Sequence, residues 1–533
     1  MGLLRSTMLI GQIVLGCGFL VGIVAADPVS DLLQQSLQPR LAASTELQVE
    51  DRDVPLAVAE FYAARHWAPL WNNKRFTVLL NEIANLYTDG LNPDDYDLPA
   101  LKQLQNLGTD PARLAKREKL ATRAYLLALI QLYHGKVDPV KLDAHWNFDT
   151  RSIDPEQGLK LALEAVENNR IEDIFERARP TLPQYGALRT ALANLRQTAL
   201  AGGWPLVPTG SPLKPGADDP RVPILRQRLA AVGLLSISPD QTTIYDPATV
   251  HAVQRFQNES YLKTDGIVGP ETLRELNVPI EQRIGQLRAN LERMRWFLGH
   301  IKGNFVLVDI AGYHVYYLHD NKPLWKSRVQ IGKSYRQTPI FKSEITYITL
   351  NPTWTVPPTI LREDSLPAIR HSLTYLSRNH IRVLNTHGQI LSPRSINWKH
   401  PGKITLRQDA GPDNSLGQLV LRFPNPYDVY MHDTPHQSLF SSKQRAFSSG
   451  CIRVENILEL AVLLFNDPET WSRQELDTAL ATGKTRNISL HQATPVLIAY
   501  WTVDVAQDGY VSFRPDIYDQ DAKILKALDD RMP

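Results

Sequence analysis

The chain has 533 residues, which is enough for three or four domains with sizeable cores. Its 58 Lys and Arg residues nearly balance its 56 Asp and Glu residues, and the sequence has no basic tract, so nucleic acid is not expected as a partner. The 37 prolines favour extended connections and edge strands over one large helical bundle.

Residues 1–26 have the pattern of an export signal. Arg5 precedes an apolar run over residues 7–26, which ends in Val-Ala-Ala before Asp27. Small residues at this position are typical of a cleavage site, so we expect a cleaved signal and a periplasmic location. The run is also just long enough to span a bilayer, which leaves an uncleaved inner-membrane anchor as an alternative. A lipoprotein site at Cys17 is disfavoured because the apolar run continues past it.

Residues 27–205 predict a helical scaffold domain. Segments 55–71 and 118–134 carry apolar residues at helical spacing, and Gly135 supplies a stop signal after the second segment. The stretch from 202 to 220 is rich in Gly and Pro and therefore predicts a domain boundary.

Residues 218–278 predict a compact unit of three helices. Helices are expected to begin near residues 224 and 249, Gly233 ends the first, and a Gly turn at 265–269 leads into the third. A further helix within 279–300 carries four arginines. We expect this helix to connect two domains and its charged face to be exposed to solvent.

The pattern changes to strands at Asn304. Two strands at 305–310 and 313–318 flank Ala-Gly and predict a hairpin. Further strands are expected at 329–332, 345–350, 419–423 and 428–432. Residues 359–408 interrupt them with helix-like and loop-like sequence, and an insertion at this place predicts a lid. We therefore expect a β-rich domain over 301–470 with a lid subdomain at 359–408, followed by a C-terminal extension over 471–533.

Cys451 is the most informative residue of the chain. It follows Ser-Ser-Gly, lies nineteen positions after His432, and is the only cysteine besides Cys17. Exported proteins normally pair their cysteines in disulfides, so a solitary thiol with a histidine close upstream predicts a nucleophile and its base. A buried structural cysteine is the alternative, but polar neighbours are not typical of a core.

A thiol whose pKa is close to the reference value is only about 3% ionised at neutral pH. A cysteine nucleophile therefore needs activation. His432 is the expected base, and a backbone carbonyl is expected to orient its ring because Asp433 points to the other face. His436 is a second candidate in a less fixed loop position. A helix expected from residue 452 would favour the thiolate, and the N–H groups of Gly450 and Cys451 would form an oxyanion hole.

Two further residues are candidates for the same site. Tyr430 shares a strand face with His432 and is expected to line the site, although a packed strand aromatic is the alternative. Arg453 fits two roles equally well: it would bind a substrate carboxylate, or pin its loop through backbone carbonyls.

These motifs resemble those of a known enzyme family. His-x-Thr-Pro at 432–435 followed by Ser-Ser-Gly-Cys-Ile-Arg-Val at 448–454 resembles the signature of L,D-transpeptidases with a YkuD-type catalytic domain. The match is closest to the large, lid-bearing Gram-negative branch of the YcbB type, and segments 351–357 and 411–417 agree with it. Ser449 stands where many relatives carry His, a variant typical of this branch. Residues 218–278 resemble a small peptidoglycan-binding module.

The resemblance implies a multidomain α+β protein with an N-terminal helical scaffold, a three-helix peptidoglycan-binding module and a β-rich catalytic domain with an inserted lid. It implies that Cys451 attacks the third residue of a peptidoglycan tetrapeptide stem, releases D-alanine, and passes the acyl group to a second stem as a 3–3 cross-link. This chemistry needs no metal or other cofactor. Hydrolysis or D-amino-acid exchange on the same stems, and an inactive wall-binding scaffold, stay open as alternatives.

The resemblance also implies partners and a donor site. The partners expected are peptidoglycan stems as donor and acceptor, with other cell-wall synthases as candidates, and the membrane is met only through the N-terminal segment. The wall-binding role of the 218–278 module is open, because the matching positions are mostly core and turn residues. The residues expected to line the donor site are Tyr430, Trp354, Asn414, Ser449 and Arg453.

Overall fold

The computed structural model describes residues 27–43, 53–143, 146–148, 151–236, 241–296, 303–506 and 508–530. The expected export signal and Cys17 therefore lie outside the described residues. Across these ranges, no helix combines the length and the apolar character needed to cross a membrane.

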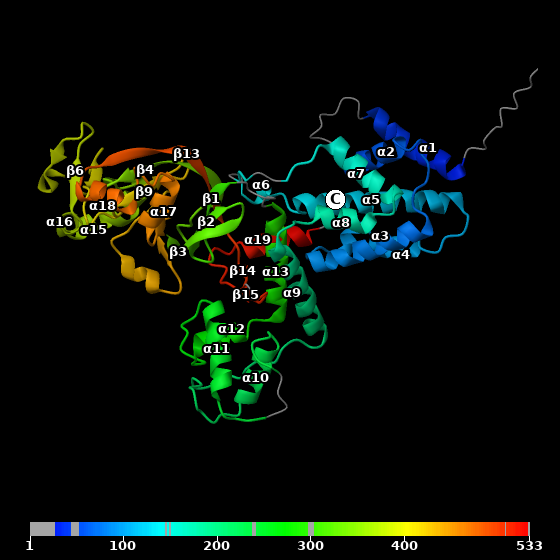
Figure 1. Cartoon of the computed structure of the whole chain (residues 1–533), viewed down its shortest axis with the longest axis horizontal. Coiled ribbons are helices and arrows are strands. Elements are labelled where there is room, and N and C mark those ends of the chain that lie inside the picture. Colours follow the sequence, from blue (N-terminus) through cyan, green and yellow to red (C-terminus); the bar gives the residue numbers. More distant parts are fainter. Residues whose placement is uncertain are drawn as a thin grey trace, which may run out of the picture.

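The N-terminal part is the helical domain that the sequence predicts. Its longest helix, α5 (Pro111–His134), runs through the right-hand lobe of Figure 1 and contacts α1, α2, α3 and α8. Gly135 ends α5 with a φ of 95°, as expected from the sequence. The other elements are α1 (Pro28–Ala43), α2 (Val54–Ala63), α3 (Asn73–Asn85), η2 (Leu86–Asp89), η3 (Pro93–Tyr96), α4 (Leu98–Gln103), α6 (Pro139–Leu142), α7 (Pro155–Glu167), α8 (Ile171–Ala178) and α9 (Pro183–Leu200).

The three-helix unit is also present and projects from the middle of the molecule, at the bottom of Figure 1. It consists of α10 (Val222–Ala230), α11 (Pro247–Glu259) and α12 (Pro270–Leu276). Leu225, Val253 and Leu276 lie in its core. Gly233, at a φ of 74°, follows the first helix as predicted.

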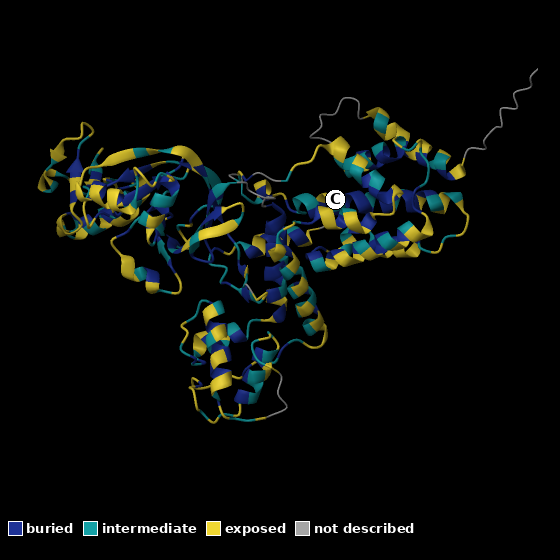
Figure 2. Ribbon diagram, viewed as in Figure 1, coloured by how far each residue is buried: buried dark blue, intermediate teal, exposed yellow. Residues whose placement is uncertain are grey.

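Helix α13 (Ile280–Trp296) is buried at the junction of the domains. It is dark blue over most of its length in Figure 2. The expectation of a solvated charged face is wrong, because three of its arginines are buried and each meets a carboxylate. The pairs are Arg283–Glu275, Arg293–Asp521 and Arg295–Glu292.

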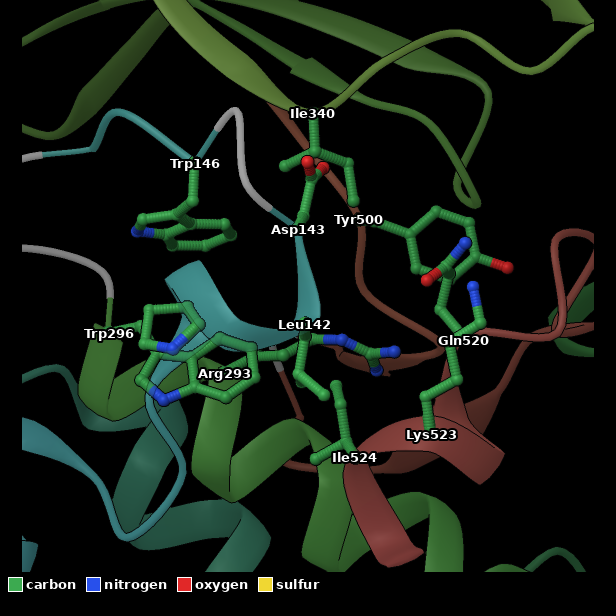
Figure 3. Close-up of a pocket in the computed structure, with 11 residues that line it drawn as sticks. Leu142, Asp143, Trp146, Arg293, Trp296, Ile340, Tyr500, Gln520, Lys523 and Ile524 are labelled. Carbon is green, nitrogen blue, oxygen red and sulfur yellow. The ribbon is translucent and has the colours of Figure 1, made fainter. Parts of the chain in front are cut away.

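A small cavity beside α13 marks the place where the scaffold, the sheet and the C-terminal helix meet (Figure 3). Trp146 and Trp296 line it edge to face, with ring centroids 5.5 Å apart. Tyr500 reaches it from the sheet and Ile524 from α19 (Asp521–Asp529). Apolar contacts therefore accompany the ion pairs at this junction. The short strands β14 (Val503–Val505) and β15 (Val511–Phe513) pack against α9 nearby.

The β-rich lobe is built on a nine-stranded sheet with the order β11-β3-β12-β10-β9-β4-β13-β1-β2. The predicted hairpin is present as antiparallel β1 (Asn304–Asp309) and β2 (His314–His319). Two helices, α17 (Ile457–Phe465) and α18 (Arg473–Ala481), pack into the same core. The other strands are β3 (Lys322–Gly332), β4 (Phe341–Leu350), β9 (Leu419–Arg422), β10 (Met431–His432), β11 (Ala446–Ser448), β12 (Ile452–Val454) and β13 (Arg486–Ala499).

Strand β13 lies inside this sheet, between β4 and β1. It pairs with β1 in parallel and with β4 antiparallel, and Val496 and Ile498 are buried in the core. The segment after residue 470, expected as a C-terminal extension, therefore contributes an inner strand to this sheet. Its long separation from β1 in sequence hides this pairing from local pattern analysis.

The insertion is a small unit with its own core, at the far left of Figure 1. It contains the expected helices, but it also has a four-stranded sheet with the order β5-β8-β6-β7, and it begins with Trp354. Ile369, Val383 and Leu406 lie in its core. Its elements are β5 (Trp354–Thr355), α14 (Pro358–Ile360), the π-helical turn η4 (Leu361–Ser365), α15 (Leu366–His371), α16 (Thr374–Arg378), β6 (Ile381–Leu384), β7 (Ile390–Leu391), η5 (Pro393–Ser395) and β8 (Thr405–Gln408).

The buried pair of α13 gives a stability prediction. Glu292→Gln leaves the Arg295 guanidinium buried without its carboxylate, so we expect a loss of about 3–5 kcal/mol in the free energy of unfolding. Urea denaturation followed by circular dichroism measures it. Glu281→Gln, at an exposed position of the same helix, serves as control and should change little. Equal stability of the Glu292→Gln variant and the parent would contradict this account of the junction.

Candidate active site

Strands β10 and β12 are parallel neighbours in the sheet, and their pairing assembles the site. His432 lies opposite Arg453 in the ladder, and the Ile452 N–H donates to the Tyr430 carbonyl at 3.0 Å. Cys451 thus comes next to Tyr430 at the start of β12. Because side chains alternate along a strand and paired residues of parallel strands share a face, these four side chains lie on one face of the sheet.

Ser448 fixes the turn that presents Cys451. Its Oγ donates to the Cys451 carbonyl at 2.6 Å and accepts the Gly450 N–H at 3.1 Å. The Thr338 hydroxyl donates to the Gly450 carbonyl at 2.8 Å. Gly450 has a φ of 117°, a conformation that favours glycine. The turn is therefore held by the side-chain hydroxyls of Ser448 and Thr338.

The helix expected directly after Cys451 is absent, and that prediction was wrong. Ile452 and Val454 are buried in the core while Arg453 faces the other way, which is the alternation of a strand. Helix α17 begins only at Ile457, six residues after the thiol. A helix dipole acts over about one turn, so α17 gives no direct support to a thiolate.

The turn leaves one backbone donor open where the sequence predicted two. The Gly450 N–H is taken by Ser448 Oγ. The Cys451 N–H makes no hydrogen bond to any residue that the structure describes. The expected oxyanion hole therefore reduces to the N–H of Cys451 in this conformation.

The Cys451 thiol is arranged as a neutral group. Its Sγ lies 3.8 Å from the carbonyl oxygen of Asp428, the geometry of a weak thiol donor. Burial raises the pKa of the thiol, although a hydrogen bond with the Tyr430 backbone and the guanidinium groups of Arg453 and Arg422 act in the opposite direction. Because burial prevails, the thiolate is not the resting form at neutral pH.

His432 is a buried, neutral imidazole. Only 4% of the residue is exposed, and burial, followed by the nearby Arg453 charge, lowers its pKa to about 3. Its Nδ1 bonds to the Asp433 carbonyl oxygen, as the sequence predicted for a backbone carbonyl. The Asp433 carboxylate instead accepts the Gln418 N–H at 2.9 Å. With Nδ1 protonated, Nε2 keeps the lone pair that a base needs.

The described thiol and imidazole do not hydrogen-bond to each other in this conformation, because the thiol is turned toward Asp428. His436, the second candidate base, is exposed at the start of η6 (Gln437–Ser441). Its backbone N–H bonds to Thr434 Oγ1 at 3.2 Å. His432 is thus buried beside Cys451, whereas His436 lies at the surface.

Two arginines give the face a positive potential. The Arg422 guanidinium lies 4.5 Å from the centroid of the Tyr430 ring, and Arg453 Nη1 donates to Gln330 Oε1 at 3.2 Å. Neither guanidinium forms an ion pair with a described carboxylate, and the Arg453 Nε is buried without a partner among the described residues. An anionic ligand suits such a face.

The remaining residues predicted for the donor site lie in the loops and the inserted unit around the Cys451 turn. Asn414 is buried, and its amide donates to the carbonyls of Pro352 at 3.0 Å and Asp409 at 2.8 Å, so it holds the loop before β9. Trp354 packs against the core of the inserted unit. Ser449 is exposed on the turn. Substrate contact by these three side chains stays a prediction.

Sequence reasoning missed three residues of the neighbouring framework. Thr338 and Arg336, in the loop after β3, bond to Gly450 and Ser449, and Gln330 of β3 bonds to Arg453. More than a hundred residues separate these partners, and only a close relative of known structure could have linked them. Among the described residues, the acidic, His and Cys side chains form no cluster of three that could hold a metal ion.

Comparison with known families decides the class of this lobe. Residues 303–466 match the family model described as "L,D-transpeptidase catalytic domain". The chain carries an L,D-transpeptidase catalytic domain. Residues 218–276 match a model described as "Putative peptidoglycan binding domain", and residues 56–192 match one described as "Scaffold domain". The multidomain α+β organisation predicted from the sequence is thereby confirmed.

One curated relative carries a matching description. A Haemophilus influenzae protein described as "Putative L,D-transpeptidase" is 33% identical over 244 residues, which are 45% of this chain and 48% of that protein. The match therefore spans about half the length of that relative.

Two solved structures are also matched in part. An L,D-transpeptidase (residues 123–326) from Xylanimonas cellulosilytica is 16% identical, covering 55% of this chain and 99% of the other, with a TM-score of 0.17. One from Mycobacterium smegmatis is 15% identical, covering 38% and 59%, with a TM-score of 0.19. Scores this low carry no argument about the fold.

The raised pKa of Cys451 predicts how its reactivity depends on pH. Deprotonation is shifted upward, so the rate of alkylation by iodoacetamide should keep rising through about pH 9. Mass spectrometry of the peptide that contains Cys451 measures this rate, with free N-acetylcysteine as reference. A plateau between about pH 5 and pH 8 would instead reveal a thiolate–imidazolium pair and contradict the neutral resting state.

Proposed function

We propose that this chain is a peptidoglycan L,D-transpeptidase that forms 3–3 cross-links through a thioester on Cys451. The observation that carries the proposal is the register of β10 and β12, because it sets the thiol and a neutral imidazole on one face of an L,D-transpeptidase catalytic domain. The matched peptidoglycan-binding domain supports the same substrate class. We place the reaction in the periplasm, with other cell-wall synthases as candidate partners.

In the first half-reaction, the thiol of Cys451 turns from the Asp428 carbonyl toward His432, whose Nε2 accepts the proton. The sulfur attacks the carbonyl carbon of the third stem residue, and the Cys451 N–H stabilises the resulting oxyanion. His432 then gives its proton to the nitrogen of the leaving D-alanine as the C–N bond breaks. The product is a thioester between Cys451 and the tripeptide stem.

The pKa values of the two groups determine the timing of the proton transfer. Each unit of mismatch between thiol and imidazole costs about 1.4 kcal/mol, so a free thiolate–imidazolium pair is strongly disfavoured before attack. The proton therefore leaves sulfur as the C–S bond forms, with His432 acting as a general base in the transition state. A neutral resting thiol is also protected from unproductive alkylation and oxidation.

In the second half-reaction, a side-chain amine of another stem attacks the thioester. His432 accepts a proton from this amine, the C–S bond breaks, and the proton returns to sulfur. This step forms the new amide and regenerates the thiol, so the sequence balances without a redox partner. The uncompensated charges of Arg422 and Arg453 favour stem peptides, which carry several carboxylates.

Products from purified tetrapeptide stems test the function. The parent protein should yield a cross-linked dimer and free D-alanine, detected by mass spectrometry, whereas tripeptide alone would identify a hydrolase. Cys451→Ala should still bind sacculi and form no dimer. His432→Gln should slow product formation by about 10²–10⁴-fold, the usual contribution of a general base. Dimer formation by Cys451→Ala would refute the mechanism.

A further inference from the structure

Arg336 connects the lid to the turn that carries Cys451. Its guanidinium donates to Glu363 Oε2 at 2.9 Å, to Asp364 Oδ1 at 3.0 Å and to Ser449 Oγ at 3.0 Å. Glu363 and Asp364 lie in η4 of the lid, and Ser449 is two residues before Cys451. One side chain thus contacts both the lid and the reactive turn.

The two sides of this contact differ in burial. The Arg336 side chain is 13% exposed, whereas the side chains of Glu363 and Asp364 are 43% and 47% exposed. The cation is therefore set into the catalytic lobe, and its carboxylates lie at the surface of the lid.

The loop of Arg336 is braced independently of the lid. The Arg336 N–H donates to the Lys333 carbonyl at 2.9 Å, and Thr338 Oγ1 accepts the Gly332 N–H at 2.9 Å. The Thr338 N–H donates to the hydroxyl of Tyr518 at 3.1 Å. These bonds lie within the catalytic lobe, so they hold the backbone of this loop beside Ser449 without any contribution from the lid.

The geometry at Arg336 is that of a carboxylate receptor. Both terminal nitrogens bond to the two oxygens of Asp364, the planar fork in which arginine binds carboxylates. Glu363 adds a second carboxylate to the same guanidinium. Both acids lie on a π-helical turn, a rare form of helix that is frequent at functional sites.

We propose that Arg336 binds a carboxylate of the donor substrate and that Glu363 and Asp364 occupy this position when the lid is closed. The inference rests on the proposed function, which supplies a stem peptide with free carboxylates. A substrate carboxylate displaces the two lid acids from the guanidinium, and their release opens the lid. The lid acids are thus internal competitors of the substrate, and Arg336 positions the stem beside Cys451.

Binding of the tetrapeptide stem to full-length Cys451→Ala protein, measured by calorimetry, separates this role from a purely structural one. Competition predicts opposite effects: Glu363→Gln with Asp364→Asn tightens binding severalfold, and Arg336→Gln weakens it about tenfold. A structural clamp predicts that both changes weaken binding, and that result would overturn the proposal, as would absence of tetrapeptide binding. With a tetrapeptide whose carboxyl groups are amidated, Arg336→Gln should have no effect.

A matched control lies elsewhere on the lid. Arg382 and Asp409 form another exposed ion pair there, and Arg382→Gln should leave the affinity unchanged. Iodoacetamide labelling of Cys451 in the otherwise unchanged protein adds a readout that needs no substrate. Both the lid double variant and Arg336→Gln should label faster, and unchanged labelling would show that the contact does not hold the lid. If the binding effects appear as predicted but the parent protein, with Cys451 intact, forms no thioester, the proposed function fails and the carboxylate site stands.

Discussion

The parallel pairing of β10 with β12 is the constraint on which the site depends. Each strand is short, and neither would hold its position alone; both are fixed by hydrogen bonds to β9 and β3 and by burial of Met431, Ile452 and Val454. A shift of one residue in this register would turn His432 and Arg453 into the core. Apolar packing on one face of the sheet thus sets the chemistry on the other.

Burial also sets the resting state of the reactive pair. It raises the pKa of Cys451 and lowers that of His432, and the adjacent positive charge of Arg453 keeps the imidazole neutral. In the proposed mechanism the protein does not rely on a preformed thiolate, and reactivity appears when the substrate brings an electrophilic carbon to the thiol. The proposed closure of the lid on Arg336 fits this design, because access to the thiol would then depend on a ligand that carries a carboxylate.

The sequence was sufficient for features whose cause is local. The local sequence placed the reactive turn, through the small residues and glycine before Cys451, and the histidine at a strand end. It also placed the ends of α5 and α10, through Gly135 and Gly233. It was insufficient where the cause lies far along the chain. Three residues, Ile452 to Val454, cannot distinguish a helix start from a strand without the neighbouring β10. The burial of α13 depends on acids as distant as Asp521. The contact of Arg336 with the lid depends on Glu363 and Asp364, which follow it by 27 and 28 positions.

The most direct test of the account is to trap the acyl-enzyme. Full-length protein is mixed with tetrapeptide stem in the absence of an acceptor, quenched with acid, and analysed by intact-mass and peptide mass spectrometry. The account predicts one tripeptide adduct per molecule, on the peptide that contains Cys451, with an equal amount of D-alanine released. Cross-link formation without any adduct on Cys451, or an adduct at another residue, would contradict it.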